Sequence, residues 1–246
     1  MRVDMEVHQR TRILIGEEGL SKLKSSSLII FGLGGVGGAA AEHLCRAGVG
    51  QLTIVDSDVV KESNLNRQII ALKSTVGRKK AIVLAERLAD VAPDCVITPT
   101  VEFFSADNAE LFDLASYDFI LDCIDSLNPK IELISRAVNA GLRIITSAGA
   151  GGRLDPEGVR VTDLFETRNC PLARVMRKRL RARGINSPIP TVNTEALPLT
   201  PSAPLEPEEL GRGRPRTPVG SISYLPPIFG AVMAGYVIRQ LLQKPL

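Results

Sequence analysis

The sequence predicts an α/β protein with a doubly wound, Rossmann-like and mostly parallel sheet. Two observations support this: short apolar runs alternate with helical stretches through residues 28–148, and the first run ends in a glycine-rich turn before a helix. At 246 residues the chain can bury the core of one large domain. We expect an N-terminal arm at 1–27, a nucleotide-binding core at 28–152 and a C-terminal extension at 153–246.

The glycine-rich turn is the strongest local signal. A buried strand at 28–32 ends at Gly32, and Gly34, Gly35 and Gly37 follow, with Gly32, Gly34 and Gly37 in G-x-G-x-x-G spacing. Residues without Cβ allow a sharp bend and let phosphate oxygens approach the backbone, while the following helix points its positive end at them. The turn predicts a nucleotide site; the alternative is a glycine turn without a ligand.

A carboxylate closes the second strand, which we expect at 52–56. Asp56 comes about twenty residues after the glycine turn, where dinucleotide-binding sheets hold a ribose hydroxyl. A dehydrogenase would show the same turn and the same acid. These two features therefore predict a nucleotide without saying which one.

The remaining elements follow the alternation and then depart from it. Strands are also predicted at 95–100, 119–123 and 143–148, and helices at 17–23, 35–47, 78–91, 107–115 and 129–140. Beyond residue 152 we expect a strand at 159–163, a helix at 171–183, a proline-rich flexible loop at 184–220 and a final apolar helix at 227–242. A buried or dimer-packed final helix is favoured over a membrane span, because Arg239 and Gln240 interrupt it.

Composition narrows the class of protein. Hydrophobic and charged contents of 44% and 23% are ordinary for a soluble globular protein. The net charge of +3 means that any contact with nucleic acid needs a local basic patch, and 4% aromatics without Trp disfavour base-stacking platforms. The four cysteines form no C-x-x-C pair, and residues 1–12 lack an apolar signal segment. We expect a reduced, cytoplasmic protein without a Cys₄ zinc site.

Charged and amide side chains gather after the strands. In a doubly wound sheet such residues share one crevice outside the carboxyl ends of the strands. NAD seldom needs an Arg, a Lys and a spare Asp there, whereas a triphosphate with magnesium needs cations for its charge and a carboxylate for the metal. The residues concerned are Asp58, Asn66, Arg67, Gln68, Lys80 and Asp125.

These motifs resemble the adenylating domain of ubiquitin-activating, ThiF- and HesA-type enzymes: GxGGVG, D-x-D-x-V from Asp56, S-N-x-N-R-Q at 63–68 and the later Asp125. Within that superfamily the second half resembles the tRNA threonylcarbamoyladenosine dehydratases. The similar stretches are residues 149–152 with 155–156, 161–164, 171–173 ahead of a basic helix, 193–197, and 220–221 with Pro226.

The resemblance implies roles for these residues. Asp56 would hold the ribose of ATP and Asp125 the Mg²⁺. Arg12 looks like the arginine that this family lends to the neighbouring subunit, which implies a homodimer. The alternatives are surface charges for the cations, a helix cap for Asp125 and a supporting role for Asp58. The residues implied to hold the nucleotide are Gly32, Gly34, Gly35, Gly37, Asp56, Asp58, Asn66, Arg67, Gln68, Lys80 and Asp125, with Arg67, Lys80, Asp125 and Arg12 as the catalytic set.

The chemistry implied by the resemblance is activation of a carboxylate. The acid of the threonylcarbamoyl group beside the tRNA anticodon attacks the α-phosphate of ATP, which gives an acyl adenylate and pyrophosphate. The ureido nitrogen of the same group then closes a ring and expels AMP. The protein contributes positioning and charge neutralisation.

No cysteine nucleophile is needed for this ring closure. Cys45, Cys95 and Cys123 fall in or beside core elements and are expected to be structural. Cys170 stands where the dehydratases usually have an aspartate, which puts the role of that acid in doubt; a reactive thiol is the alternative.

A basic stripe on the 171–183 helix predicts the contact with tRNA. Arg174, Arg177, Lys178 and Arg181 recur at helical spacing, opposite an apolar stripe. Three further arginines of the proline-rich loop, Arg212, Arg214 and Arg216, would add a second cluster. The alternative is a solvated helix face.

Two other functions remain open at this point. The adenylating domain could activate the C-terminal glycine of a ubiquitin-like sulfur carrier, although the absence of C-x-x-C pairs and the basic helix speak against it. A NAD-binding regulatory module would leave Arg67, Lys80 and Asp125 without a role. A sulfur-transfer protein is a conceivable partner, and the sequence does not identify it.

Overall fold

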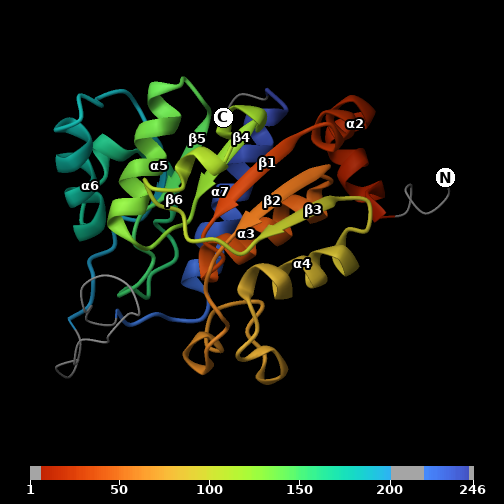
Figure 1. The fold of residues 1–246 in the computed structure, drawn as a ribbon, viewed down its shortest axis with the longest axis horizontal. Helices are drawn as coiled ribbons and strands as arrows, with labels where there is room; N and C mark the ends of the chain where they lie inside the picture. The colour runs from red at the N-terminus through yellow and green to blue at the C-terminus, as the bar shows by residue number, and fades with distance from the viewer. Residues whose placement is uncertain (1–6, 201–218, 244–246) are drawn as a thin grey trace.

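A computed structural model describes residues 7–200 and 219–243. Its centre is one seven-stranded sheet with helices on both faces, which confirms the predicted fold class (Figure 1). The strands are β1 (Ser27–Phe31), β2 (Gln51–Val55), β3 (Val96–Thr100), β4 (Phe119–Asp122), β5 (Ile144–Ser147), β6 (Arg160–Asp163) and β7 (Pro190–Asn193). The helices are α2 (Gln9–Lys24), α3 (Gly35–Ala47), α4 (Lys80–Val91), α5 (Leu127–Asn139), α6 (Pro171–Arg181) and α7 (Leu225–Leu241).

The strand order is β3-β2-β1-β4-β5-β7-β6, and only β6 runs antiparallel to its neighbour. β1 therefore lies between β2 and β4, with Ile30 opposite Ile54 on one side and Leu121 on the other. The chain order reverses between β1 and β4, so the crevice expected of a doubly wound sheet opens beyond the carboxyl ends of these strands.

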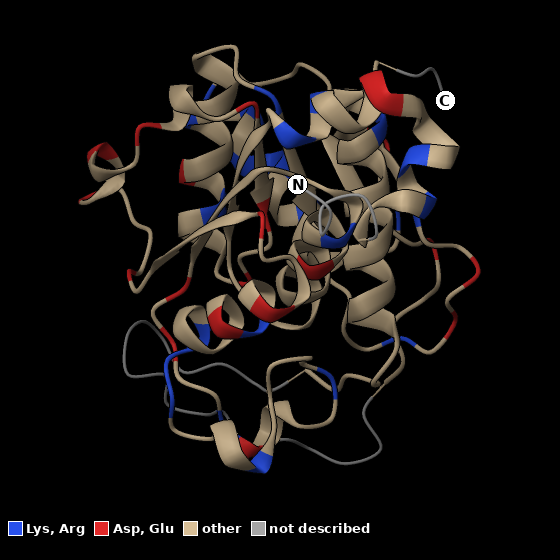
Figure 2. Cartoon of the chain, turned by 90° about the vertical axis from the view of Figure 1, so that its right-hand side faces the viewer, with Lys and Arg blue, Asp and Glu red and all other residues tan. Residues whose placement is uncertain are grey.

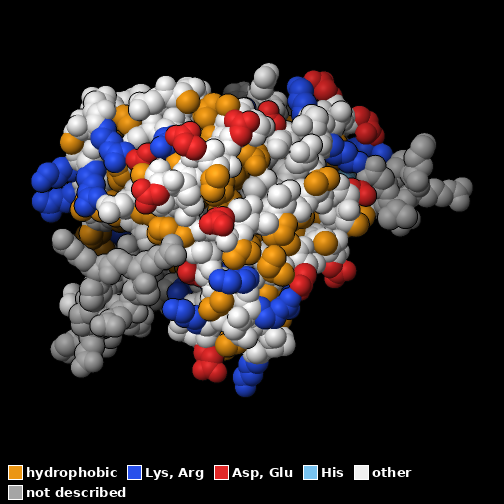
Figure 3. All heavy atoms as spheres, viewed as in Figure 1, with side chains coloured by type: hydrophobic (Ala, Val, Ile, Leu, Met, Phe, Trp, Pro, Cys, Tyr) orange, Lys and Arg blue, Asp and Glu red, His pale blue; other side chains and the backbone are white. Residues whose placement is uncertain are grey.

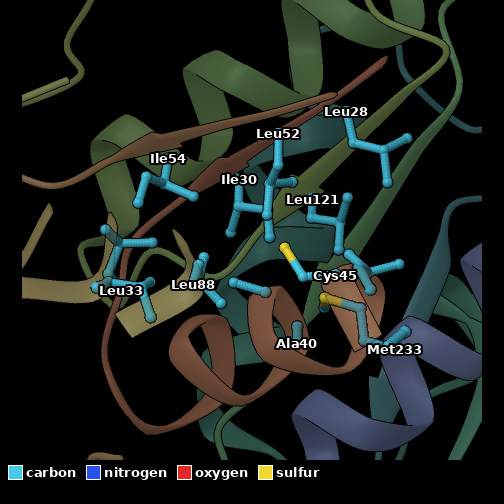
Figure 4. Close-up of a cluster of buried hydrophobic side chains, with 14 of the residues drawn as sticks. Leu28, Ile30, Leu33, Ala40, Cys45, Leu52, Ile54, Leu88, Leu121 and Met233 are labelled. Atoms are coloured by element: carbon cyan, nitrogen blue, oxygen red, sulfur yellow. The ribbon is translucent and has the colours of Figure 1, made fainter. Parts of the chain in front are cut away.

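Alternate residues of β1 pack into two separate hydrophobic cores, one on each face of the sheet. Leu28 and Ile30 pack with α3, α4 and α7, whereas Ile29 and Phe31 pack with α5 and α6. Figure 4 shows the first of these cores, in which Ala40 and Cys45 of α3 and Met233 of α7 lie beneath the sheet. Burial on both faces explains why the strand reads as an unbroken apolar run. Charged residues of both signs lie along the helices and loops around the sheet (Figure 2).

The helix predicted at 107–115 is wrong. The segment forms two 3₁₀ turns, at Ala109–Leu111 and Leu114–Ser116, separated by Phe112 in an extended conformation. The Phe112 ring lies 5.2 Å from that of Phe31 and 5.6 Å from that of Phe104, between ring centroids. Packing of this aromatic cluster outweighs the helical preference of a short segment.

The loop predicted at 184–220 is also corrected, because it contains β7. This strand lies in the sheet between β5 and β6, and Thr191, Val192 and Asn193 are buried. The Asn193 amide donates to Thr162 Oγ1 of β6 at 2.7 Å, and the Thr191 hydroxyl donates to the Ile189 carbonyl oxygen at 2.9 Å. Four residues that begin with Pro are too few for a periodicity signal. The rest of that loop, from 201 to 218 and with Arg212, Arg214 and Arg216, lies outside the described residues.

The N-terminal arm is more helical than predicted. α2 starts at Gln9 instead of near Glu17, with a kink at Gly16, whose φ is +79°. Its buried Leu20 and Leu23 anchor the second part of the helix just before β1. Across residues 7–200 and 219–243, no helix combines the length and hydropathy that crossing a bilayer would require.

Candidate nucleotide-binding site

The glycine turn joins β1 to α3 and can be built only without side chains. Gly32 has a φ of +88°, and a Cβ there would lie 2.6 Å from the Cys123 carbonyl oxygen. A Cβ on Gly37 would lie 1.8 Å from the Gly32 carbonyl oxygen. The bend therefore needs glycine at both positions, as the spacing predicted, and it leaves the start of α3 facing the crevice.

Asp56 lies directly beside this turn. Its Oδ2 accepts a hydrogen bond from Leu33 N at 2.7 Å, and its Oδ1 accepts one from Asp58 N at 2.8 Å. Burial raises the pKa of Asp56, although Lys80 and the two backbone N–H groups act in the opposite direction. The carboxylate is thus held rigidly at the carboxyl end of β2, next to the bend.

Lys80 enters the same crevice from the first turn of α4. Its side chain is buried, and its Nζ lies 3.0 Å from Asp58 Oδ2. Lys80 N also donates to the Asp58 carbonyl oxygen at 3.0 Å, so the loop between β2 and α4 closes on itself. A lysine kept among carboxylates gives the site a cation that cannot move far into solvent.

The segment 66–68 packs against the glycine turn from the other side. A Cβ on Gly35 would lie 3.3 Å from the Arg67 carbonyl oxygen, and one on Gly34 would lie 3.8 Å from Gln68 Nε2. Gln68 is 8% exposed, and its Oε1 is buried without a hydrogen-bond partner among the described residues. A buried, unsatisfied acceptor next to a phosphate-type turn is a feature that a ligand or water can complete.

The side chains of Asn66 and Arg67 already have protein partners. Asn66 Nδ2 donates to the Ser221 carbonyl oxygen at 2.9 Å. Arg67 Nη1 donates to Asn66 Oδ1 at 2.7 Å and to the Ser63 carbonyl oxygen at 2.9 Å. The sequence placed Ser221 in a stretch similar to the dehydratases but did not reveal its contact with Asn66, which lies 155 positions away in the chain.

Asp125 follows β4 in a segment that contacts the glycine turn through Cys123 and Ile124. Ser126 takes the N-cap position of α5, one residue after Asp125, and its hydroxyl lies 3.3 Å from Asp125 Oδ1. Asp125 is therefore at the carboxyl end of the strand next to β1, as the sequence predicted.

A fully buried ion pair between Lys130 and Asp122 supports the segment that leads to Asp125. Lys130 Nζ lies 2.6 Å from Asp122 Oδ2 and 2.9 Å from Thr146 Oγ1, and both charged side chains are 0% exposed. Asp122 Oδ1 accepts from Ile124 N at 3.2 Å, which holds the turn that leads to Asp125. Sequence reasoning missed Lys130, although its place one turn into a helix after a buried strand was the available signal.

Arg12 does not join these residues within one chain. It lies on α2, which precedes β1 and leads into the amino end of that strand, whereas the glycine turn follows its carboxyl end (Figure 1). There Arg12 Nη1 forms an ion pair with Glu17 Oε1 at 3.0 Å. Two exposed apolar side chains, Ile13 and Leu14, follow it on the same helix.

The cysteines lie in packed positions. Cys45 Sγ is 3.8 Å from Cys95 Sγ, and Cys123 Sγ is 3.5 Å from Met233 Sδ. Burial raises the pKa of the Cys123 thiol, which makes it a poor nucleophile.

Cys170 is the N-cap of α6. Its Sγ accepts hydrogen bonds from Ala173 N and from Gly149 N, each at 3.4 Å. An aspartate at this position could accept the same two bonds, which gives the thiol a structural role in place of a chemical one.

The basic side chains of α6 fall into two groups: those with partners among the described residues and those without. Arg177 donates to the carbonyl and hydroxyl oxygens of Thr167, and the Arg181 guanidinium lies 5.1 Å from the Phe165 ring centroid. The side chains of Arg174 and Lys178 are exposed and form no hydrogen bond or ion pair with the described residues. Figure 3 shows Lys and Arg side chains gathered at the left edge of the molecule, where Figure 1 draws α6.

Together, the doubly wound sheet, the glycine turn and the Asp, Lys, Arg and Asn residues on the adjoining segments are typical of a nucleotide-binding α/β protein. The model of the ThiF family matches residues 8–246. The chain therefore belongs to the ThiF family, as its motifs indicated.

Individual relatives indicate a narrower group within this family. The tRNA threonylcarbamoyladenosine dehydratase of Bacillus subtilis is 33% identical over 244 residues, which cover 96% of each chain. The enzyme of the same name from Escherichia coli is 40% identical over 172 residues, 70% of this chain and 64% of that one.

Solved structures agree with the sequence relatives. The Escherichia coli tRNA N6-threonylcarbamoyladenosine dehydratase in complex with AMP is similar with a TM-score of 0.89 at 32% identity, over 98% of this chain and 95% of that one. The same enzyme in complex with ATP gives a TM-score of 0.88. The similarity thus extends over the C-terminal extension as well as the nucleotide-binding core.

Proposed function

We propose that this protein is an ATP-dependent adenylating enzyme that cyclises threonylcarbamoyladenosine next to the tRNA anticodon. The observation that supports the proposal is that the segments carrying Asp56, Arg67 and Asp125 approach one glycine turn, with Lys80 paired to Asp58 beside Asp56. Relatives that share almost the whole chain bear the name of this dehydratase, and one of them is solved with ATP.

ATP would lie across the glycine turn. The Asp56 carboxylate would accept a hydrogen bond from the ribose, while the start of α3 faces the phosphates. Asn66, Arg67 and Lys80 would neutralise the triphosphate. Because the Asn66 and Arg67 side chains are bonded to each other and to backbone carbonyls, binding requires these contacts to exchange for phosphate oxygens.

Magnesium fits the site through Asp125. Among residues 7–200 and 219–243, no group of three or more His, Cys, Asp or Glu could hold a metal ion on its own. Mg²⁺ is commonly held by one or two carboxylates together with substrate phosphates, which is the donor set that Asp125 beside a triphosphate would supply. The ion would add charge neutralisation at the phosphates.

The reaction requires the threonyl carboxylate to lie next to the α-phosphate of ATP. The threonyl carboxylate attacks the α-phosphorus, the bond to the β-phosphate oxygen breaks, and pyrophosphate leaves. The ureido nitrogen next attacks the acyl carbon, loses its proton and expels AMP as the ring closes. No protein nucleophile is consumed, which agrees with the packed cysteines. Arg67 and Lys80 stabilise the charge that develops on the phosphates.

The tRNA backbone would lie along α6. Arg174 and Lys178 are exposed on this helix, so they can exchange water for phosphate oxygens without breaking an internal contact. Arg177 and Arg181 add positive charge, but each also holds α6 to Thr167 or Phe165. The sharper test is therefore Arg174→Glu with Lys178→Glu, which should weaken tRNA binding and leave ATP binding unchanged.

We also propose a homodimer in the cytoplasm. Arg12 lies on α2, which leads into the amino end of β1, whereas the glycine turn follows the carboxyl end, so Arg12 would serve a triphosphate in a second copy. Ile13 and Leu14, which are exposed, would be covered in such a contact. Partnership with a sulfur-transfer protein stays a prediction. The oligomeric state in solution and the effect of Arg12→Ala on adenylation test the dimer.

The decisive experiment is ATP–pyrophosphate exchange by purified protein. Exchange that depends on threonylcarbamoyladenosine-containing tRNA, and not on a ubiquitin-like carrier protein, is the expected result. Exchange with the carrier alone would contradict the proposal, and so would tight NADH binding without ATP binding.

A further inference from the structure

Arg153 is a buried charged side chain outside the nucleotide site. It lies in the segment that follows β5 and is only 4% exposed. Its guanidinium donates four hydrogen bonds: Nε to the Ala196 carbonyl at 2.9 Å, Nη1 to the Gly149 and Gly151 carbonyls at 2.8 and 3.0 Å, and Nη2 to the Asn169 carbonyl at 2.7 Å.

No carboxylate among the described residues forms an ion pair with this arginine, so backbone carbonyl dipoles alone offset its charge. Burying a guanidinium in this way is expensive unless its donors are satisfied, and the planar fork of Arg is suited to reaching several acceptors at once. A lysine has three donors on a point charge and cannot span the same set.

The four carbonyls belong to three segments that meet only in the folded protein. One follows β5, one precedes α6 and one follows β7. Further contacts join the same segments: Asn169 Nδ2 donates to the Glu195 carbonyl at 2.7 Å, and Gly149 N donates to Cys170 Sγ. Arg153 is thus the centre of a clamp at the carboxyl edge of the sheet.

The clamp is connected to the nucleotide site through the residues that precede α7. Gly152 N donates to the Gly220 carbonyl at 2.7 Å, and the next residue, Ser221, accepts from Asn66 Nδ2 at 2.9 Å. A Cβ on Gly151 would lie 2.9 Å from Val219 Cγ1, so the two segments are in close contact. Hence the segment that Arg153 holds is linked, through Gly220 and Ser221, to Asn66, which is proposed to bind the triphosphate.

We propose that Arg153 is a positioning residue for the acid substrate: it holds residues 149–151, 169 and 196 as one wall against which the carboxylate is placed for attack on ATP. This inference rests on the proposed adenylating function. Displacement of a reacting group by about 1 Å can lower a rate about 100-fold, so a loosened wall should lower kcat for the acid-dependent step and leave ATP binding intact.

Arg160 provides a matched control. It lies at the same edge of the structure and forms an ion pair with the Glu195 side chain, next to Ala196, but its side chain is 50% exposed. Arg160→Met removes the same charge without opening the clamp. A difference in activity between Arg153→Met and Arg160→Met is therefore caused by loss of the clamp and not by loss of one positive charge.

The test compares Arg153→Met, Arg153→Lys and Arg160→Met in ATP–pyrophosphate exchange, with both modified tRNA and a carrier protein as acceptors. For whichever acceptor supports exchange in the wild type, Arg153→Met should lower kcat about 10- to 100-fold. ATP affinity, measured by calorimetry, should stay within about twofold. Arg153→Lys should recover part of the rate, because it retains some donors, and Arg160→Met should match the wild type.

Three results would overturn the inference: an unchanged kcat in Arg153→Met, an equal loss of ATP affinity and kcat, or an equal defect in Arg160→Met. The ATP titration also reports whether each variant is folded, and Arg153→Lys supplies the smaller perturbation. Exchange with the carrier alone would refute the tRNA function and leave the role of Arg153 testable on that acceptor.

Discussion

Replacing Lys130 by Met should destabilise the protein strongly, because it leaves the Asp122 carboxylate as a buried charge without a positively charged partner. The Lys130 ammonium lies 2.6 Å from Asp122 Oδ2, and both side chains are 0% exposed. Met has a similar length and no charge, so the variant removes the ion pair and the Nζ contact with Thr146 while it keeps most of the packing volume.

The size of the effect follows from this burial. Removing one partner of a buried pair typically costs about 3–5 kcal/mol, far more than the loss of an exposed pair. In urea, with a slope of about 3 kcal/mol per M for a chain of this size, the unfolding midpoint should fall by about 1–1.7 M. Because Asp122 also holds Ile124 N, the loss should extend to the segment that carries Asp125.

The control is the double variant Lys130→Met with Asp122→Asn, which removes both charges of the buried pair. The asparagine can still accept from Ile124 N, and its amide can donate to Thr146, so no charge remains buried. We expect the double variant to recover about 2–3 kcal/mol relative to Lys130→Met. Urea unfolding followed by far-ultraviolet circular dichroism measures all three proteins. A cost below about 1 kcal/mol for Lys130→Met, or no recovery in the double variant, would refute the reasoning.

Three further predictions concern single side chains. Burial opposes ionisation of Glu42, but hydrogen bonds from Arg87 and Arg46 outweigh it and hold the pKa below its ordinary value of 4.5. The ion pairs of Glu42 therefore stabilise the folded protein above about pH 4.5, and this stabilisation is lost as the pH falls through the lower native pKa. Glu42→Gln should lower the thermal midpoint at pH 7 and differ less from the wild type near pH 3. Cys170→Asp should raise stability by about 1 kcal/mol, or about 2–4 °C in calorimetry, because a carboxylate caps α6 better than a thiol; a fall at neutral pH would contradict the cap assignment. Asp125→Ala should abolish ATP–pyrophosphate exchange and leave the circular dichroism spectrum intact, and normal turnover would rule out the magnesium assignment.

The nucleotide-binding half was readable from the sequence because its signals are local. A run of apolar residues, glycines that cannot bear a Cβ and an acid at the end of the next strand occur within thirty residues of one another. Asp56 lies beside the turn because parallel strands end at one edge, a rule that needs no knowledge of side-chain packing. The family resemblance supplied the triphosphate and the tRNA, which spacing alone did not.

The errors fall where long-range packing overrides local preference. The expected helix at 107–115 is broken by the contact of Phe112 with Phe31, a residue about eighty positions away. The buried Asn193 side chain of β7 donates to Thr162 Oγ1 of β6, which lies 31 positions away in the chain. No sequence window contains those partners, so neither feature had a local signal.

The sequence by itself determined the doubly wound core, the glycine turn and the acid that accompanies it, because each depends on steric limits and periodicities a few residues long. Only the tertiary structure decided how Arg153 gathers three segments, how Ser221 meets Asn66 and how Lys130 supports the approach to Asp125. Those contacts depend on which distant carbonyls and carboxylates a folded chain brings within about 3 Å of one another, and hydrogen bonds act only at that range.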